Sequence, residues 1–169
     1  MKLPLFLVTG ASGTGKSTIV PYLQRLLPMC DVFDMDIMLD ETDWKISQHN
    51  WIRIAKSLVE QGRYTILCGT TLPEHFVEYA EMSAFSTVYY INLHCEDAIR
   101  DERLAARQWS APLIDDHRVF ARWLLAHANT AFDPPLETID TGTNTPEAVA
   151  TFIQQWVLAC MMKAESAKA

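Results

Sequence analysis

A run of glycines followed by a lysine and a serine is the strongest chemical signal in this chain. Residues 10–18 read GASGTGKST and fit the pattern G-x-x-x-x-G-K-[ST], with Gly15, Lys16 and Ser17 in the required places. A loop of this kind points successive backbone N–H groups into one concavity at the positive end of a helix, where an anion is stabilised. The segment therefore predicts a binding site for phosphate groups.

The side chains in this loop suit a nucleoside triphosphate such as ATP, together with its metal ion. Lys16 can reach the β- and γ-phosphates, and the Ser17 hydroxyl can ligate Mg²⁺. The glycines permit backbone angles and a close approach that a side chain would obstruct. We expect the nucleotide to be bound by Gly10, Ala11, Ser12, Gly13, Thr14, Gly15, Lys16, Ser17 and Thr18.

Two elements must hold this loop in place. Residues 5–9 read LFLVT, an apolar run of the kind found in buried strands, and residues 17–27 have apolar side chains at helical spacing. Pro21 lies past the first turn of this helix and predicts a kink there. A strand, a glycine-rich loop and a helix in this order form the context that the motif requires.

The rest of the chain alternates between short apolar runs and amphipathic segments. Strands are expected at residues 30–33, 64–68, 87–93 and 136–139. Helices are expected at residues 47–61, 73–82 and 96–107, from Asp115 or Asp116 to about residue 129, and from Thr145 onward, with a short loop at 108–114. This alternation is typical of an α/β protein with a parallel sheet covered by helices on both faces.

Polar residues follow three of the expected strands. The phosphate loop follows the first strand, Asp34 and Asp36 follow the second, and residues 69–71 (GTT) follow the third. Right-handed crossovers place ligands at the carboxyl ends of parallel strands. We therefore expect these three segments to gather at one edge of the sheet.

Composition limits the possible classes of protein. The 169 residues suggest a single domain over residues 1–162 with a frayed tail at 163–169, and the formal charge of −7 disfavours a broad surface for nucleic acid. Cys30, Cys68, Cys95 and Cys160 are far apart, so we interpret them as reduced thiols of a cytoplasmic protein. No apolar run reaches membrane-spanning length, and we expect no signal peptide.

The loop, the length and the order of elements together resemble the P-loop kinases of small molecules and nucleotides. That group includes shikimate and gluconate kinases, nucleoside and nucleotide kinases, and antibiotic phosphotransferases. The resemblance implies a three-layer α/β/α P-loop NTPase fold with a parallel sheet of about five strands in the spatial order 2-3-1-4-5. It also implies a short lid between two late helices, here at about residues 107–115.

The resemblance gives roles to the two acids after the second strand. Asp34 and Asp36 match a D-x-D pattern in several members of the group. Transferred to this chain, Asp36 would orient the acceptor hydroxyl or take its proton, and Asp34 would bind Mg²⁺ through water. The alternative is that both are solvated acids that cap a turn.

Three arginines of the chain resemble residues of the same kinases that close over the phosphates when the lid closes. The run DERLAAR is similar to the E-R-L-x-x-R stretch that leads into their lid, and it places Arg100, Arg103 and Arg107 on one helix face. We assign Arg103 and Arg107 to the transferred phosphate and leave Arg100 undecided between function and a solvated face. Arg118 and Arg122 stay undecided between phosphate, acceptor and an exposed helix face.

The loop after the fifth strand resembles a segment that packs on the adenine ring in related kinases. This comparison places Asp140 and Thr141 at the nucleotide, although ordinary turn chemistry explains them almost as well. The third strand ends in Cys68, so the magnesium-binding aspartate that many P-loop ATPases carry there is absent. That departure gives Asp34 more weight in the hypothesis.

The segment expected to face the acceptor contains more acids than bases. Its charged and aromatic residues are Asp36, Asp40, Glu41, Asp43, Trp44, His49, Trp51 and Arg53. The excess of acids favours a neutral or cationic polyhydroxy acceptor over a monophosphate, although Arg53 could reverse this preference. We interpret His49 as a surface residue, and the two tryptophans as packing residues more than as a stacking platform.

These observations predict a kinase that depends on Mg²⁺ and ATP and phosphorylates a hydroxyl of a small molecule such as a nucleoside, a sugar or a similar polyol. The alternatives are a nucleoside monophosphate kinase and a regulatory module that binds ATP without transferring phosphate. A polynucleotide-end kinase is disfavoured by the negative charge. The expected partners are ATP and a small-molecule acceptor, in a monomer or a homodimer without membrane attachment.

Overall fold

A parallel sheet of five strands forms the centre of the protein, in a computed structural model that describes residues 2–38 and 43–166. The strands lie in the order β2-β3-β1-β4-β5, and every neighbouring pair is parallel. Their bounds are β1 Leu5–Thr9, β2 Cys30–Asp34, β3 Tyr64–Cys68, β4 Val88–His94 and β5 Glu137–Asp140. The strand order expected from the sequence is confirmed. Asp40 and Glu41 lie outside the described residues.

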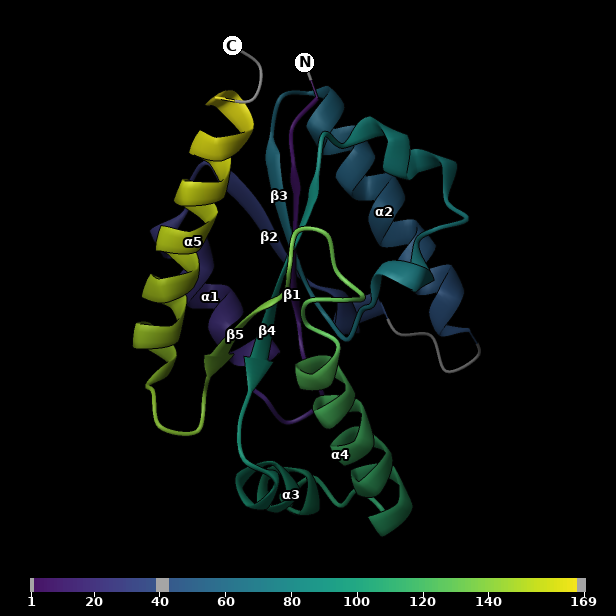
Figure 1. Cartoon of the computed structure of the whole chain (residues 1–169), viewed down its shortest axis with the longest axis vertical. Coiled ribbons are helices and arrows are strands. Elements are labelled where there is room, and N and C mark those ends of the chain that lie inside the picture. The colour runs from purple at the N-terminus through teal and green to yellow at the C-terminus, as the bar shows by residue number, and fades with distance from the viewer. Residues whose placement is uncertain (1, 39–42, 167–169) are drawn as a thin grey trace.

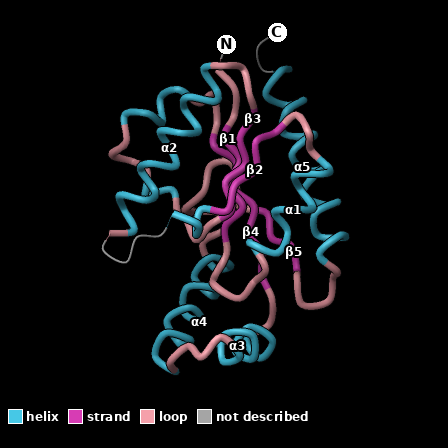
Figure 2. Tube along the Cα trace, turned by 180° about the vertical axis from the view of Figure 1, so that it is seen from behind, coloured by secondary structure: helices cyan, strands magenta, loops and turns pink. Residues whose placement is uncertain are grey.

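Helices cover both faces of this sheet (Figures 1 and 2). The α-helices are α1 Lys16–Leu26, α2 Trp44–Glu60, α3 Asp97–Ala106, α4 Ala111–Ala126 and α5 Pro146–Ser166, of which α3 lies beyond the carboxyl ends of the strands (Figure 1). Helices α1 and α5 pack against each other on one face, and α2 covers the other face. None of the helices within the described ranges is long and apolar enough to cross a membrane.

Alternation along β1 shows why both faces of the sheet are buried. Phe6 and Val8 point into the core beneath α1 and α5, whereas Leu5 and Leu7 point into the core beneath α2. All four side chains have no exposed surface. Successive residues of a strand face opposite sides, so a central parallel strand reads as an unbroken apolar run. The sheet therefore fixes β1 firmly, and with it the start of the phosphate loop.

The segment after β3 differs from the helix expected at residues 73–82. It forms two short 3₁₀ turns, η2 Pro73–His75 and η3 Ala80–Ala84. The buried or half-buried residues Phe76, Tyr79 and Met82 are three positions apart, and the backbone N–H of each later one donates to the carbonyl of the one before it. A spacing of three matches the 3₁₀ period. This spacing therefore favours 3₁₀ turns over the continuous helix expected at residues 73–82.

The start of α4 also differs from the expectation. The sequence analysis placed a loop at 108–114 and a cap at Asp115 or Asp116, but α4 begins at Ala111 with Ser110 at the N-cap position. Pro112 lies in the first turn, where its missing N–H costs nothing because that group has no partner within the helix. The link between α3 and α4 is therefore short, and Gln108 in it has a left-handed backbone with φ 60°.

Candidate functional site

Glycine is required at two places in the phosphate loop for different steric reasons. Gly10 has φ +145°, and a Cβ there would lie 2.5 Å from the carbonyl oxygen of Leu93. Gly13 has φ +84°, and a Cβ there would lie 3.1 Å from Cγ of Arg100. Both positions combine a backbone conformation that other residues disfavour with a tight neighbour. The loop is thus held close to both β4 and α3.

Lys16 is buried beneath this loop and neutral groups hold its ammonium. Its Nζ donates to the carbonyl oxygens of Gly10 at 2.8 Å and Ala11 at 2.9 Å, and the residue is 6% exposed. Burial lowers the pKa of Lys16 to about 8, although Asp36 opposes this shift. The cation lies in a place that is short of negative charge, and phosphate oxygens would supply that charge.

A groove above Lys16 combines the phosphate loop with two of the predicted catalytic residues. It is lined by residues 12, 13 and 15–18 of the loop, including Ser17, and by Asp36 and Arg107. The Arg107 guanidinium makes no hydrogen bond or ion pair with any described residue, so it is available to a ligand. The phosphate loop, the acids after β2 and residues 69–71 gather at one edge of the sheet, as expected: Asp36 lines the groove, and the Thr70 hydroxyl donates to the Gly10 carbonyl at 3.1 Å.

The two acids after β2 differ in their surroundings. Asp34 accepts the backbone N–H of Asp36 through Oδ1 at 3.0 Å, which is a turn contact. Asp36 lines the groove, where partial exclusion of water raises its pKa, while Lys16 lowers it and Asp34 raises it. The carboxyl of Asp36 therefore lies within electrostatic reach of Lys16, and Asp34 supports its loop.

A second cavity of about 230 Å³ continues from the glycines toward the start of α5. Arg103 lines it and donates to the carbonyl oxygens of Gly13 at 3.0 Å and Thr141 at 3.3 Å. The Thr141 hydroxyl donates to the carbonyl of Thr14 at 2.8 Å, so the β5 loop is fastened to the phosphate loop. Asp140 is not in the wall of this cavity: its carboxylate accepts from Gly142 N and from the Thr143 hydroxyl.

A third cavity, of about 650 Å³, lies on the other side of Asp36 between α2 and α4. Asp36 and Ser12 line both this cavity and the phosphate groove. Its other walls come from α2, from the segment after β3, and from the α3–α4 link and α4. A molecule bound there would contact the carboxylate that also borders the groove.

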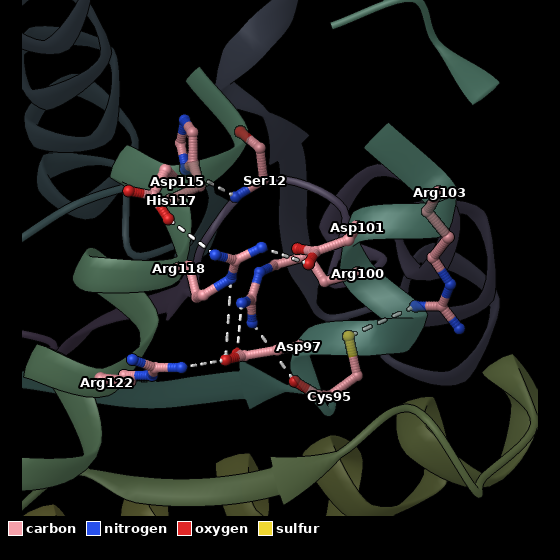
Figure 3. Close-up of polar contacts among 10 residues, drawn as sticks. All are labelled: Ser12, Cys95, Asp97, Arg100, Asp101, Arg103, Asp115, His117, Arg118 and Arg122. Atoms are coloured by element: carbon pink, nitrogen blue, oxygen red, sulfur yellow. Dashed lines mark hydrogen bonds and ion pairs between the residues drawn. The ribbon is translucent and has the colours of Figure 1, made fainter. Parts of the chain in front are cut away.

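Three of the undecided arginines belong to an ion-pair network that joins α3 to α4 (Figure 3). Arg100 has no exposed surface and pairs with Asp97, and Arg122 reaches the same carboxylate at 2.6 Å. Arg118 donates to Asp101 at 2.6 Å and to Asp115 at 2.7 Å. These contacts occupy the three guanidiniums with protein carboxylates and make them structural connectors in this arrangement.

His117 is a site residue that the sequence analysis missed. It lies on α4, lines the 650 Å³ cavity, and accepts the backbone N–H of Ser12 at Nδ1 over 3.1 Å (Figure 3). Burial lowers its pKa, and the positive charges of Lys16 and Arg100 lower it further. The sequence carried no signal for this contact, since the helix was expected to begin only one or two residues before His117.

The tryptophans of α2 separate into one packing residue and one cavity residue. Trp51 is 3% exposed and donates Nε1 to the carbonyl of Met35, as expected of a packing residue. Trp44 is 45% exposed and lines the large cavity, which differs from the packing role expected for it. Arg53 is exposed on α2 and does not line this cavity. His49 lies at the surface against Glu81, as expected.

Solved structures with the same fold include several small-molecule kinases, at low sequence identity. A gluconokinase from Sinorhizobium meliloti 1021 is 14% identical, with a TM-score of 0.66 and all of both chains covered. A sugar kinase from Janibacter sp. HTCC2649 is 15% identical, with a TM-score of 0.65 and 93% and 95% covered. Shikimate kinase from Acinetobacter baumannii, in complex with shikimate, is 14% identical, with a TM-score of 0.62 and 94% of each chain covered. The chain therefore has the P-loop kinase fold.

The sequence itself matches one family model. Residues 7–123 match the AAA domain, which is more than half of the chain, and this protein belongs to that family. The match begins within β1 and includes the phosphate loop, both acids after β2, and all of α3. No curated protein matches the sequence.

Proposed function

We propose that the protein is a kinase that transfers the γ-phosphoryl group of ATP to a hydroxyl of a small molecule, with Mg²⁺ as the metal. The observation that carries this proposal is the position of Asp36 in the wall shared by the phosphate groove and the 650 Å³ cavity. A hydroxyl bound in the cavity would meet the carboxylate and the terminal phosphate at one point. Phosphoryl transfer requires mainly such positioning and neutralisation of charge.

In this proposal each charged side chain has a distinct task. The acceptor oxygen forms a bond to the γ-phosphorus, the bond from that phosphorus to the β–γ bridging oxygen breaks, and the proton of the acceptor goes to Asp36. The raised pKa of Asp36 makes it a better proton acceptor than an ordinary aspartate. Lys16 and Arg107 border the groove and would offset the charge on the transferred group.

Arg103 and Thr141 would serve the nucleotide on the opposite side of the loop. The 230 Å³ cavity that they line adjoins the glycines and shares no lining residue with the 650 Å³ cavity. ATP and the acceptor would therefore enter the site from different sides. Arg103 already contacts the carbonyl of Gly13, so it would also stabilise the conformation of the loop. Asp140 would act indirectly, by holding the turn that carries Thr141.

The residues near the groove fit a magnesium ion bound with ATP. The Ser17 hydroxyl lines the groove beside Lys16, and Asp34 keeps a second carboxylate oxygen beyond the one that accepts from Asp36. Mg²⁺ commonly uses one or two protein ligands together with phosphate oxygens and water. When bound, it would neutralise phosphate charge, with Ser17 as direct ligand and Asp34 acting through water.

The test is transfer of radiolabelled γ-phosphate to a panel of nucleosides, polyols, sugars and sugar acids. We expect acceptor-dependent formation of ADP and of a labelled product in the wild type. Asp36→Asn should abolish most of the transfer, whereas the control Asp115→Asn, which removes a surface carboxylate outside both cavities, should not. Tight ATP binding with no transfer to any member would instead support the regulatory module.

A further inference from the structure

We propose, on the basis of the function above, that the acceptor is an uncharged alcohol with a flat aromatic or heteroaromatic body. The acceptor cavity, which we define as the 650 Å³ cavity beside Asp36, carries aromatic rings on two sides and two aspartates, and none of the described residues that line it is a lysine or an arginine. This inference narrows the acceptor beyond a small hydroxyl compound. It excludes sugar acids, phosphorylated acceptors and simple polyols as preferred substrates.

Charge is the first argument. Among the described residues, no lysine or arginine lines the acceptor cavity, while Asp36 and Asp116 both do. Recognition of a carboxylate or phosphate normally uses arginine or lysine. An anionic acceptor would therefore enter a cavity whose charged groups repel it.

The arginines near the acceptor cavity are committed elsewhere. Arg118 is held by Asp101 and Asp115, and Arg122 is held by Asp97. Arg107 lines the phosphate groove and the 230 Å³ cavity beside the glycines, but it does not line the acceptor cavity. None of these guanidiniums is thus placed to bind an anionic group of the acceptor.

Aromatic rings are the second argument. Trp44 from α2 contacts His75 with ring centroids 4.9 Å apart, and Trp109 from the α3–α4 link contacts His117 with centroids 5.2 Å apart. All four line the acceptor cavity, as does Phe120. Trp44 is 45% exposed, so part of its ring surface is open to a ligand. Two such ring pairs suit a flat ligand, since offset and edge contacts between rings are favourable.

A buried amide adds hydrogen-bonding preference. Gln48 is 8% exposed and lines the acceptor cavity, and its Nε2 donates to the Thr70 carbonyl at 3.3 Å. Because a carbonyl only accepts, this contact fixes which end of the amide is nitrogen. The buried Oε1 then has no hydrogen-bond partner within the described residues. This oxygen is covered as the side chain stands, so a donor on the ligand would reach it only after the Gln48 side chain turns toward the cavity.

The experiment uses four types of probe, which combine the presence or absence of negative charge with the presence or absence of an aromatic ring. The uncharged aromatic probes are thymidine and 1-phenyl-1,2-ethanediol, and the aromatic anions are thymidine monophosphate and the ring-carboxylated phenylethanediol. Ribitol is the uncharged polyol. Gluconate and shikimate are the anions without an aromatic ring. Binding to the wild type with MgADP is measured by calorimetry and by tryptophan fluorescence. Phosphoryl transfer from ATP is measured separately. We expect the uncharged aromatic probes to bind at least about tenfold more tightly than each of the others.

Two variants test the reasons for this preference. Asp116→Lys adds a base to the cavity wall and should reduce the discrimination between thymidine and its monophosphate by about tenfold. Glu102→Lys changes the net charge equally on the exposed surface of α3, outside the cavity, and should leave that ratio unchanged. Trp44→Leu should weaken the uncharged aromatic probes and leave ribitol unaffected, and its exposed position makes a folding defect avoidable.

The outcomes separate this inference from the proposed function. Tight binding of the uncharged aromatic probes without transfer supports the inferred ligand class and overturns the kinase proposal. Transfer to gluconate, shikimate or ribitol in preference to the aromatic probes overturns the inference and leaves the kinase proposal standing. Equal binding of all probe types, or no binding of any, also overturns the inference.

Discussion

The N–H of Ser12, inside the phosphate loop, donates to Nδ1 of His117 on α4 over 3.1 Å. This bond fixes the tautomer, because Nδ1 accepts only when it carries no proton, which leaves the proton on Nε2. It also joins the wall of the acceptor cavity to the phosphate-binding backbone. The contact ties together two parts of the site that are 105 positions apart in the chain.

Replacing His117 tests this connection through stability and its dependence on pH. His117→Ala should lower the free energy of unfolding by about 1 kcal/mol, the usual value of one hydrogen bond. The pKa of His117 in the folded protein lies below its ordinary 6.5, so its contribution is present above that pH and is lost as the pH falls below it. Urea unfolding at pH 5 to 8 should show a shallower pH dependence for His117→Gln than for the wild type.

The control for this experiment is His49→Gln, since His49 is a partly buried residue that contacts Glu81 and Tyr79 and lines none of the three cavities. In His49→Gln the pH dependence of the free energy of unfolding should not become shallower, as it does in His117→Gln. A wild-type slope retained in His117→Gln would show that His117 keeps no neutral contact with Ser12.

Lys16 should take up a proton when nucleotide binds at alkaline pH. Its pKa of about 8 leaves roughly three quarters of it uncharged at pH 8.5, and the added phosphate charges should raise that pKa. Calorimetry with MgADP in buffers of different ionisation enthalpy should show uptake of a substantial fraction of a proton at pH 8.5 and much less at pH 7. Lys16→Ala should bind weakly, transfer no phosphate and show no such uptake.

The two acids after β2 should give different defects. Asp36→Asn should lower kcat by roughly 10²-fold or more while the affinity for ATP barely changes, because only the proton acceptor is lost. Asp34→Asn should instead raise the Mg²⁺ concentration required for half-maximal rate. Initial rates over a matrix of ATP, acceptor and Mg²⁺ concentrations distinguish these patterns. Normal kinetics with reduced thermal stability in both variants would identify the acids as turn caps.

Replacing the arginines of α3 and of the α3–α4 link should have different kinetic effects, depending on what each guanidinium contacts. Arg107→Ala should lower kcat more than it raises the KM for ATP, because its free guanidinium would act on the charge that develops during transfer. Arg103→Ala should lower kcat and also disturb the loop that it braces through Gly13. Arg122→Ala serves as control, since its ion pair with Asp97 lies at the surface and is worth little. Full kcat in both test variants would contradict their assignment to the phosphate.

The parts of this fold that could be predicted are those with local causes. The run of apolar residues in β1, the GKS of the loop and the β3 bounds at Tyr64 and Cys68 carry their signal within a few positions. The acceptor cavity depends on contacts between distant segments, such as Trp109 with His117, and on which side of α4 faces the loop. The expected cap at Asp115 or Asp116 lies five or six residues beyond the observed N-cap Ser110, so Asp116 and His117 were expected at the end of the helix and not on its cavity-facing side.

The α3–α4 ion-pair network connects the helix beside the proposed nucleotide site with the helix beside the proposed acceptor site. Helix α3 carries Arg103, which contacts the phosphate loop, while α4 carries Asp116, His117 and Phe120 of the acceptor cavity. Because Asp97 and Asp101 of α3 both pair with Arg118 of α4, the positions of the two helices are coupled through this arginine. Nucleotide and acceptor should therefore bind with heterotropic cooperativity: each should change the dissociation constant of the other by the same factor, as thermodynamic linkage requires.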